Sequence, residues 1–222
     1  GLTCINIELT DRCNKKCWMC GRRKIDALYP EIAEKRGDMD FELLKKIQMQ
    51  LPKDVVVQLH QDGEPMLYPR LKEAIELFDD QITNIVTNGK LLVEKADDII
   101  GKLDTLSISV IENDHEADEQ YGIIEKFLEM KEDQKPLTII KLVGKVDGER
   151  YKKFNAPITK RTIASPMGTF DYEGKQPAMP EIGICWDFLH HLTVKKNGDV
   201  HICPTFDPDK IDGVQIQPSL WK

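Results

Sequence analysis

Three cysteines stand close together near the start of the chain, between Cys13 and Cys20. Their C-x3-C-x2-C spacing places three potential thiolate ligands in one short loop. A structural zinc site normally takes four ligands, so zinc here would need a fourth Cys or His from elsewhere. An iron–sulfur cluster held by three cysteines instead keeps one iron open for a small molecule, whereas ferredoxin-type clusters use four cysteines at other spacings. Both kinds of metal centre are compatible with the cysteines alone.

The residues around these cysteines favour the iron–sulfur interpretation. The segment from Leu9 to Cys20, L-T-D-R-C-N-K-K-C-W-M-C, resembles the cluster loop of the radical S-adenosylmethionine (radical SAM) enzymes. The resemblance implies that Cys13, Cys17 and Cys20 hold a 4Fe–4S cluster, with the open iron chelated by the methionine moiety of SAM. In that family the residue before the third cysteine packs near the adenine. Here it is Met19, whose polarizable thioether also packs against aromatic faces.

A second motif lies one strand-and-helix unit further along the chain. Asp62-Gly63-Glu64-Pro65 resembles the family's GGEP motif, whose backbone binds the amino group of the SAM methionine. Asp62 replaces the first glycine, while Gly63, Glu64 and Pro65 match. An ordinary Gly-Pro turn would have the same sequence, so the position of the motif after the second expected strand is the stronger argument.

Length and composition exclude several classes of protein. The chain has 222 residues, of which 41% are apolar and 31% charged, as in ordinary soluble globular proteins. A net charge of −7 argues against general nucleic-acid binding. No stretch approaches the roughly 18 apolar residues of a membrane span. Six cysteines without a secretion signal predict a reducing, cytoplasmic environment, although Gly1 is not a natural start and the true N-terminus can lie upstream.

Strand-like and helix-like segments alternate along the chain. Strands are expected over 4–9, 55–60, 82–87, 105–111, 137–143 and 160–164. Helices are expected over 41–51, 70–78, 91–103, 120–131 and 147–154. This alternation predicts an α/β fold with a parallel sheet, and six units are too few to close a TIM barrel. The resemblance implies a partial (β/α)6 TIM-like barrel, with ligands at the carboxyl ends of the strands, where the cysteine loop falls.

Other strand and turn residues are candidates for the SAM site. Ser107 and Ser109 alternate in one strand and therefore share a face. The resemblance implies that their hydroxyls reach the SAM ribose; otherwise they are simply small strand residues. Thr87-Asn88-Gly89 resembles the family's TNG turn, in which glycine supplies a positive φ angle and Asn88 can face the site.

Positive charges suggest two further contacts. Lys141 lies mid-strand and is a candidate to pair with the SAM carboxylate or with a substrate anion; a solvated lysine is the alternative. Arg22-Arg23-Lys24 directly follows the cluster loop. A charge run of this kind is usually an exposed surface, but here it is also a candidate positive patch for an acidic electron donor or substrate.

The C-terminal part carries a weaker resemblance. Cys185 precedes two hairpin-like strands around Asn197-Gly198, and Cys203 follows them. The pattern resembles SPASM and twitch domains, small extensions of radical SAM enzymes that carry auxiliary iron–sulfur clusters. Such clusters generally take four cysteines, and only Cys185 and Cys203 are available. The cluster is therefore incompletely ligated or absent, or the chain is a shortened one, or the segment is a plain hairpin. Substitute ligands would be His190, His191, His201, Asp187 or Asp207.

These patterns predict three segments: a radical SAM partial barrel over 1–165, a connector over 166–182, and a SPASM/twitch-like extension over 183–222. The resemblance implies an enzyme that cleaves SAM reductively at a 4Fe–4S cluster and abstracts a substrate hydrogen atom. Oxidation of a small polar metabolite is the favoured outcome, with a reduced flavodoxin or ferredoxin as electron donor and no nucleic-acid or membrane partner. The alternatives are a peptide-modifying SPASM maturase and a zinc-stabilised α/β binding module without catalysis.

Overall fold

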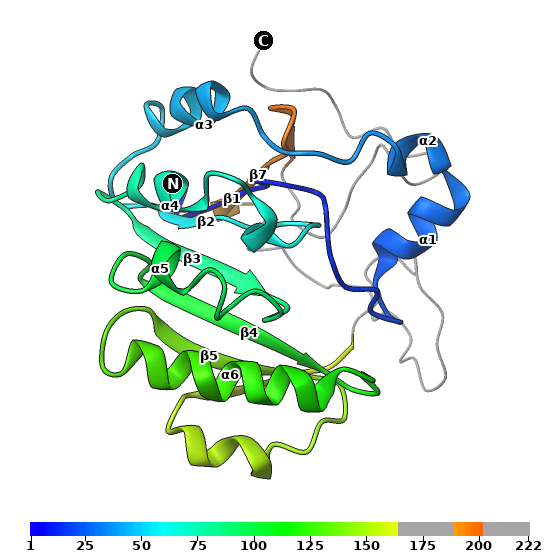
Figure 1. Ribbon diagram of the computed structural model, residues 1–222. Coiled ribbons are helices and arrows are strands. Elements are labelled where there is room, and N and C mark those ends of the chain that lie inside the picture. The colour runs from blue at the N-terminus through cyan, green and yellow to red at the C-terminus, as the bar shows by residue number, and fades with distance from the viewer. Residues whose placement is uncertain (164–188, 202–222) are drawn as a thin grey trace.

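The computed structural model describes residues 1–163 and 189–201. These residues fold around one sheet (Figure 1). The strand order is β6-β5-β4-β3-β2-β1-β7-β8. The strands are β1 (Cys4–Ile7), β2 (Val56–Gln58), β3 (Ile82–Thr87), β4 (Thr105–Ile111), β5 (Leu137–Val143), β6 (Ile158–Arg161), β7 (His191–Val194) and β8 (Val200–His201). All neighbours from β6 to β7 are parallel, and only the β7–β8 pair is antiparallel. The expected mostly parallel α/β sheet is confirmed.

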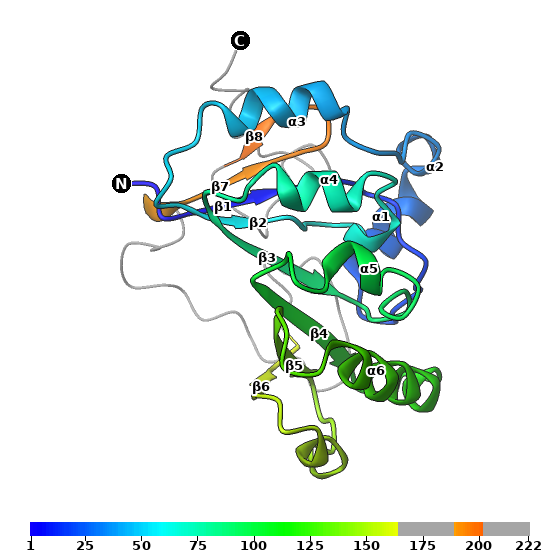
Figure 2. The ribbon, with the colours of Figure 1, turned by 60° about the vertical axis from the view of Figure 1, so that its left-hand side comes forward.

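Helices α3 to α6 cover one face of this sheet. The helices of the chain are α1 (Gly21–Leu28), α2 (Pro30–Ala33), α3 (Phe41–Gln48), α4 (Leu71–Glu76), α5 (Ala96–Ile99) and α6 (Ala117–Lys131), with 3-10 helices η1 (Pro65–Leu67) and η2 (Glu149–Phe154). Both views show α3, α4, α5 and α6 along the same side of the strands (Figures 1 and 2). We call the opposite side of the sheet the inner face. Among the described residues, no helix is long and apolar enough to cross a membrane.

Alternation along the strands explains why the two faces differ in polarity. In β4, Leu106, Ile108 and Val110 are buried, whereas Ser107 and Ser109 occupy the other face. Side chains alternate across a strand, so the apolar set packs under the helices and the serines line the inner face. Strand β4 therefore presents two hydroxyl groups to the inner face.

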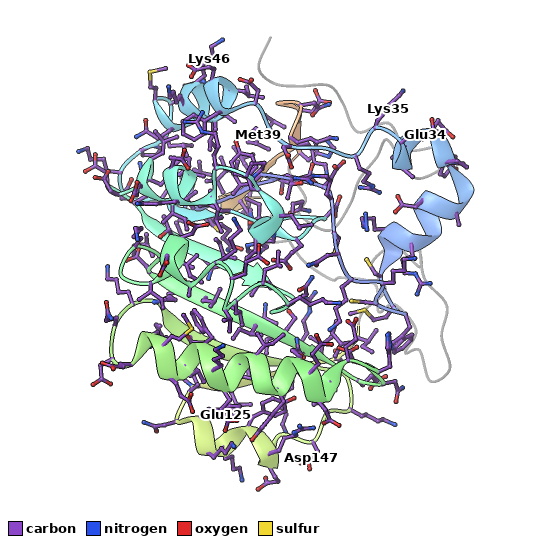
Figure 3. All side chains as sticks on the ribbon, viewed as in Figure 1. Glu34, Lys35, Met39, Lys46, Glu125 and Asp147 are labelled. Carbon is purple, nitrogen blue, oxygen red and sulfur yellow. The ribbon has the colours of Figure 1, made fainter. Side chains whose placement is uncertain are left out.

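Helix α3 forms where the sequence predicts it. Asp40 is the N-cap, and its carboxylate accepts hydrogen bonds from the backbone N–H groups of Glu42 and Leu43 at 2.8 and 3.1 Å. Met39, just before the helix, is buried in the core, whereas Lys46 points outward from α3 (Figure 3). The amphipathic pattern thus orients this helix correctly.

Two helix predictions were too simple. The segment 91–103 is mostly turn and contains only the short α5, because Ile100 is extended and Gly101 has a φ of +78°. The segment 147–154 forms the 3-10 helix η2, which ends at Asn155 in the left-handed region. Helices α1 and α2, which follow the cysteine loop, were not predicted.

The predicted C-terminal hairpin forms and continues the main sheet. Strand β7 pairs in parallel with β1, from Cys4 opposite His191 to Ile7 opposite Val194. Gly198, at a φ of +89°, makes the turn to β8. The domain boundaries proposed from the sequence remain predictions.

An ion pair ties the hairpin to the first two strands. The Lys195 ammonium lies 2.7 Å from the Glu8 carboxylate, which is 1% exposed, and 2.7 Å from the Asp62 carboxylate. Asp62 is the residue that departs from the GGEP pattern. Its carboxylate thus connects the motif to the C-terminal hairpin.

We expect Lys195→Met to lower the free energy of unfolding by about 3 kcal/mol, because it leaves the Glu8 carboxylate buried without its cation. Denaturant unfolding measures this loss. Adding Glu8→Gln should recover part of it by removing the buried charge. Lys53→Met, which removes a lysine from an exposed pair with Asp80, is the control and should stay close to wild type. An equal loss in the single and double variants would contradict a role for charge.

Candidate functional site

The cysteine loop follows β1 at the carboxyl edge of the sheet, where the sequence places it. Arg12, the residue before Cys13, fixes its start. Its guanidinium donates to the Asp38 carboxylate at 2.8 and 3.0 Å and to the carbonyl of Leu67 at 2.9 Å. The loop entrance is therefore held against the segment before α3 and against η1.

Two buried contacts hold the middle of the loop. Lys15 points into the protein and forms an ion pair with Asp114 at 2.5 Å, in which the two side chains are 3% and 6% exposed. The Trp18 indole N–H donates to the carbonyl of Glu112 at 2.8 Å. Both partners belong to the connection between β4 and α6. The loop backbone is thus fixed from a strand distant in sequence.

The cysteine thiols are unbridged and half-buried. Burial raises the pKa of Cys13, and burial together with the nearby Cys20 raises the pKa of Cys17 to about 11. The amide nitrogen of Asn88 lies 3.9 Å from the Cys13 sulfur. A metal centre that takes these sulfurs as thiolates must therefore displace their protons.

Arg22 and Arg23, from the charge run after the cysteines, also contact the loop backbone. The Arg23 guanidinium donates to the carbonyl of Lys16 at 3.1 Å, and that of Arg22 to the carbonyl of Asp11 at 3.5 Å. Arg22 also lies 3.5 Å from Asp26, one helical turn away on α1. These arginines therefore support the loop as well as contributing charge.

The Gly-Glu-Pro turn after β2 packs directly on the loop. The Glu64 backbone N–H donates to the carbonyl of Arg12 at 2.7 Å. A Cβ atom at Gly63 would lie 2.2 Å from the Thr10 carbonyl oxygen and 2.7 Å from that of Arg12. Both are backbone atoms that cannot move independently, so the close approach requires glycine here.

The side chain of Glu64 points into the protein and is 2% exposed. Its carboxylate accepts hydrogen bonds from the Thr87 hydroxyl at 2.7 Å and from the backbone N–H groups of Asn88 and Met66 at 2.8 and 3.1 Å. Burial raises the pKa of Glu64, and the hydrogen bonds oppose that rise. This carboxylate therefore positions the end of β3, while the backbone of the turn remains the candidate SAM contact.

Asn88 contacts the cysteine loop, and its role in binding SAM remains a prediction. Its amide nitrogen donates to the Asn14 side chain at 2.8 Å, and Gly89 has the expected positive φ of +83°. The carboxyl ends of β1, β2 and β3 thus converge on the cysteine loop.

The match to known proteins agrees with this geometry. The family model of the radical SAM superfamily matches residues 7–153, well over half of the chain. The chain belongs to the radical SAM superfamily.

Individual relatives resemble parts of it. The tungsten-containing aldehyde ferredoxin oxidoreductase cofactor-modifying protein of Pyrococcus furiosus is 27% identical over 110 residues, which are 47% of this chain and 28% of that protein. The chain therefore spans under a third of this relative. The crystal structure of BtrN in complex with AdoMet and 2-DOIA has a TM-score of 0.53 at 18% identity, over 92% of this chain and 74% of that one. Archaeal TYW1 has a TM-score of 0.32 at 28% identity, over 56% of this chain and 42% of that one.

A radical SAM protein uses a 4Fe–4S cluster and SAM, and the loop fits this pair. Cys13, Cys17 and Cys20 lie in one fixed loop beside the carboxyl ends of the first three strands. A 4Fe–4S cluster takes one thiolate per iron, so its ligands need not converge on a single point. Within the described residues, no group of three or more His, Cys, Asp or Glu side chains is arranged around a single ion.

The inner face holds a cavity of about 670 Å³, which we call the inner cavity. The residues that line it are Asn6, Val56, Gln58, His60, Gln61, Asp62, Ile82, Asn84, Val86, Thr105, Ser107, Lys141, Arg161 and His191. Two predicted SAM-site residues, Ser107 and Lys141, are among them. Ser109 shares their face but is not in the lining, and its carbonyl accepts a hydrogen bond from Gln120 at 2.9 Å.

Two histidines of the inner cavity were not predicted as site residues. The His60 ring Nδ1 accepts from the backbone N–H of Val86 at 3.3 Å. Burial, together with the charges of Lys141 and His191, lowers the pKa of His60 to about 3, so the ring is neutral. His191, considered as a cluster ligand from the sequence, instead lies 3.0 Å from the side-chain oxygen of Asn6. For His60 there was no signal in the sequence beyond its place at the end of an expected strand, and for His191 the sequence suggested only the role of a substitute cluster ligand.

The other predicted site residues have separate outcomes. Met19 is half-buried, and its packing on SAM remains a prediction. Cys185 and Cys203, the proposed ligands of an auxiliary cluster, lie outside the described residues. Lys15 was not predicted to support the loop, because a lysine within a charged loop gives no sign of burial. Its ion pair with Asp114 joins the loop to the connection between β4 and α6.

We expect Gly63→Ala to weaken SAM binding by about tenfold or more, because the added methyl group forces the turn away from Thr10 and Arg12. Calorimetric titration of the reconstituted protein with SAM measures this change. Gly122→Ala is the matched control, since a Cβ there meets nothing within 4 Å, and helix α6 should gain about 0.5–1 kcal/mol of stability. Wild-type SAM affinity in Gly63→Ala would contradict the tight packing.

The lowered pKa of His60 predicts a pH dependence of stability. Between its ordinary pKa of about 6.5 and about 3, the unfolded chain binds a proton that the folded chain does not. The contribution of His60 is thus complete above pH 6.5 and falls by up to about 1.4 kcal/mol per pH unit below it. Urea unfolding at pH 7, 6 and 5 should show a shallower decline for His60→Gln than for wild type. Parallel declines would show that His60 titrates alike in both states.

Proposed function

We propose that this chain is a radical SAM enzyme that cleaves SAM reductively and abstracts a hydrogen atom from a small polar metabolite, with net oxidation of that substrate. The observation that carries the proposal is the fixed cysteine loop, in which Cys13, Cys17 and Cys20 stand beside the Gly63–Glu64 turn and Asn88. When bound, the reduced cluster and SAM supply a 5′-deoxyadenosyl radical. The chain itself must bind and orient the substrate and exclude water from the site.

The residues divide this work. The three thiolates hold the cluster, and the backbone around Gly63 binds the SAM amino group. Glu64, Arg12 and Lys15 position these groups without contacting the reacting atoms themselves. Ser107 and Ser109 offer their hydroxyls to the ribose from β4, and Met19 packs near the adenine.

A small substrate is supported by the shape and lining of the inner cavity. Its volume of about 670 Å³ falls in the range usual for sites that bind small molecules, about 300–1,000 Å³. Amide, imidazole and hydroxyl groups line it from Asn6, Gln58, Asn84, His60 and Ser107. The similar proteins include a cofactor-modifying protein and, with a similar fold, BtrN in complex with AdoMet and 2-DOIA. A peptide-modifying maturase with an auxiliary cluster at Cys185 and Cys203 is the second candidate.

An acidic electron donor, of the flavodoxin or ferredoxin type, suits the outer side of the loop. A cavity of about 390 Å³ there is lined by Lys15, Lys16, Cys17, Trp18, Arg23, Ile111, Asn113, Asp114, His115 and Glu116. Its two acidic residues are paired, Asp114 with Lys15 and Glu116 with Lys90. Lys16 and Arg23 would therefore be the cations that meet the acidic surface of such a donor. We place the enzyme in the reducing cytoplasm, where its thiols persist.

We expect anaerobically reconstituted wild-type protein, given dithionite and SAM, to form 5′-deoxyadenosine, detected by mass spectrometry. Cys17→Ala should lose this activity and the brown colour of the cluster, because one iron lacks its thiolate. Cys4→Ala is the matched control, since this half-buried cysteine lies in β1 outside the loop, and it should keep both. Protein that binds zinc and remains colourless would support the binding module instead.

A further inference from the structure

The inner cavity contains two cations on neighbouring strands. Lys141 lies in the middle of β5, and Arg161 ends β6. In the register of these strands, Lys141 is opposite Thr159 and Val143 is opposite Arg161. Arg161 therefore stands on the same face as Lys141, two residues nearer the carboxyl edge, and both side chains line the cavity.

Among the described residues, these two cations lack the carboxylate partners that other cations at the site have. Lys15 has Asp114, and Lys195 has Glu8 and Asp62. Within residues 1–163 and 189–201, no acidic side chain forms an ion pair with Lys141 or Arg161. Partial burial lowers the pKa of Lys141, and the positive charge of the exposed Arg161 side chain nearby lowers it further.

The rest of the cavity offers neutral hydrogen-bonding groups. Asp62 is the only carboxylate among its described lining residues, and its Oδ2 is bonded to Lys195 at 2.7 Å. His60 is uncharged and adds a hydrogen-bonding ring nitrogen. The cavity therefore combines two cations with uncharged hydrogen-bonding groups, with the apolar side chains of Val56, Ile82 and Val86, and with one carboxylate that Lys195 already pairs.

We propose that the inner cavity binds a substrate through an anionic group, a carboxylate or a phosphate, held between Lys141 and Arg161. This deepens the proposed function and rests on it. The carboxylate of SAM is a poorer occupant, because the methionine moiety must reach the open iron, and no residue of the cysteine loop 13–20 lines the cavity. The anion would thus fix one end of the substrate and leave another part of it for hydrogen abstraction.

The test uses the full chain with its cluster reconstituted and SAM bound. Inorganic phosphate and malonate are titrated separately by calorimetry at constant ionic strength. We expect saturable binding of at least one of these anions. The ratio of their affinities distinguishes a phosphate site from a carboxylate site. Lys141→Gln and Arg161→Gln should each weaken it about tenfold or more, since each removes a charge-assisted hydrogen bond. Lys141→Arg should retain most of the affinity.

Lys160→Gln is the matched control, because it removes the same charge from the neighbouring residue of β6, which faces the other way opposite Leu142. It should leave anion binding unchanged, and none of the variants should alter SAM affinity by more than about twofold. Equal weakening by Lys160→Gln, or no saturable binding to wild type, would overturn the proposal. So would loss of SAM affinity in Lys141→Gln and Arg161→Gln with anion binding intact, which would assign the pair to SAM.

Failure of the proposed function is distinguishable from failure of this site. Anion binding that depends on Lys141 and Arg161, in protein that forms no 5′-deoxyadenosine, would keep the anion site and remove the radical chemistry. Production of 5′-deoxyadenosine without any anion binding would keep the chemistry and remove the anion site.

Discussion

The buried carboxylate of Glu64 is the interaction on which the site depends. The carboxylate accepts hydrogen bonds from the Thr87 hydroxyl and the Asn88 backbone N–H at the end of β3. The backbone N–H of Glu64 donates to the carbonyl of Arg12 at the start of the cysteine loop. Asn88 in turn reaches Asn14 within that loop. A buried carboxylate must be satisfied by hydrogen bonds, and here the groups that satisfy it come from the segments that have to meet. The conformations of three loops are therefore coupled through one side chain.

Charge is distributed differently in two parts of the protein. Around the cysteine loop, buried cations have carboxylate partners, as Lys15 has Asp114. Such pairs are costly to break once buried, so they hold a loop in one arrangement. On the inner face, Lys141 and Arg161 have no such partner among the described residues, and the surroundings are neutral. The first arrangement suits a rigid metal-binding loop, and the second suits a place that receives a charged molecule.

The C-terminal hairpin joins the sheet instead of standing apart from it. Strand β7 pairs with β1 on the side away from β2. Lys195, which directly follows β7, forms ion pairs with both Glu8 and Asp62. The residue that departs from the family's turn motif is thus the one that contacts the hairpin. This chain links its C-terminal segment to the candidate SAM turn by a charge where glycine would supply none.

The sequence by itself determined the local features of this protein. The cysteine spacing, the Gly63–Glu64–Pro65 turn and the limits of β3, β4 and β5 depend on neighbouring residues, so periodicity and motif were sufficient. Only the tertiary structure decided which distant charges meet: Lys15 with Asp114, Lys195 with Asp62, and Lys141 with Arg161 in one cavity. Strand order and register bring these side chains together across long stretches of chain. The sequence of one segment gives the sign of each charged residue, but the partner and the burial of that residue depend on how the whole sheet packs.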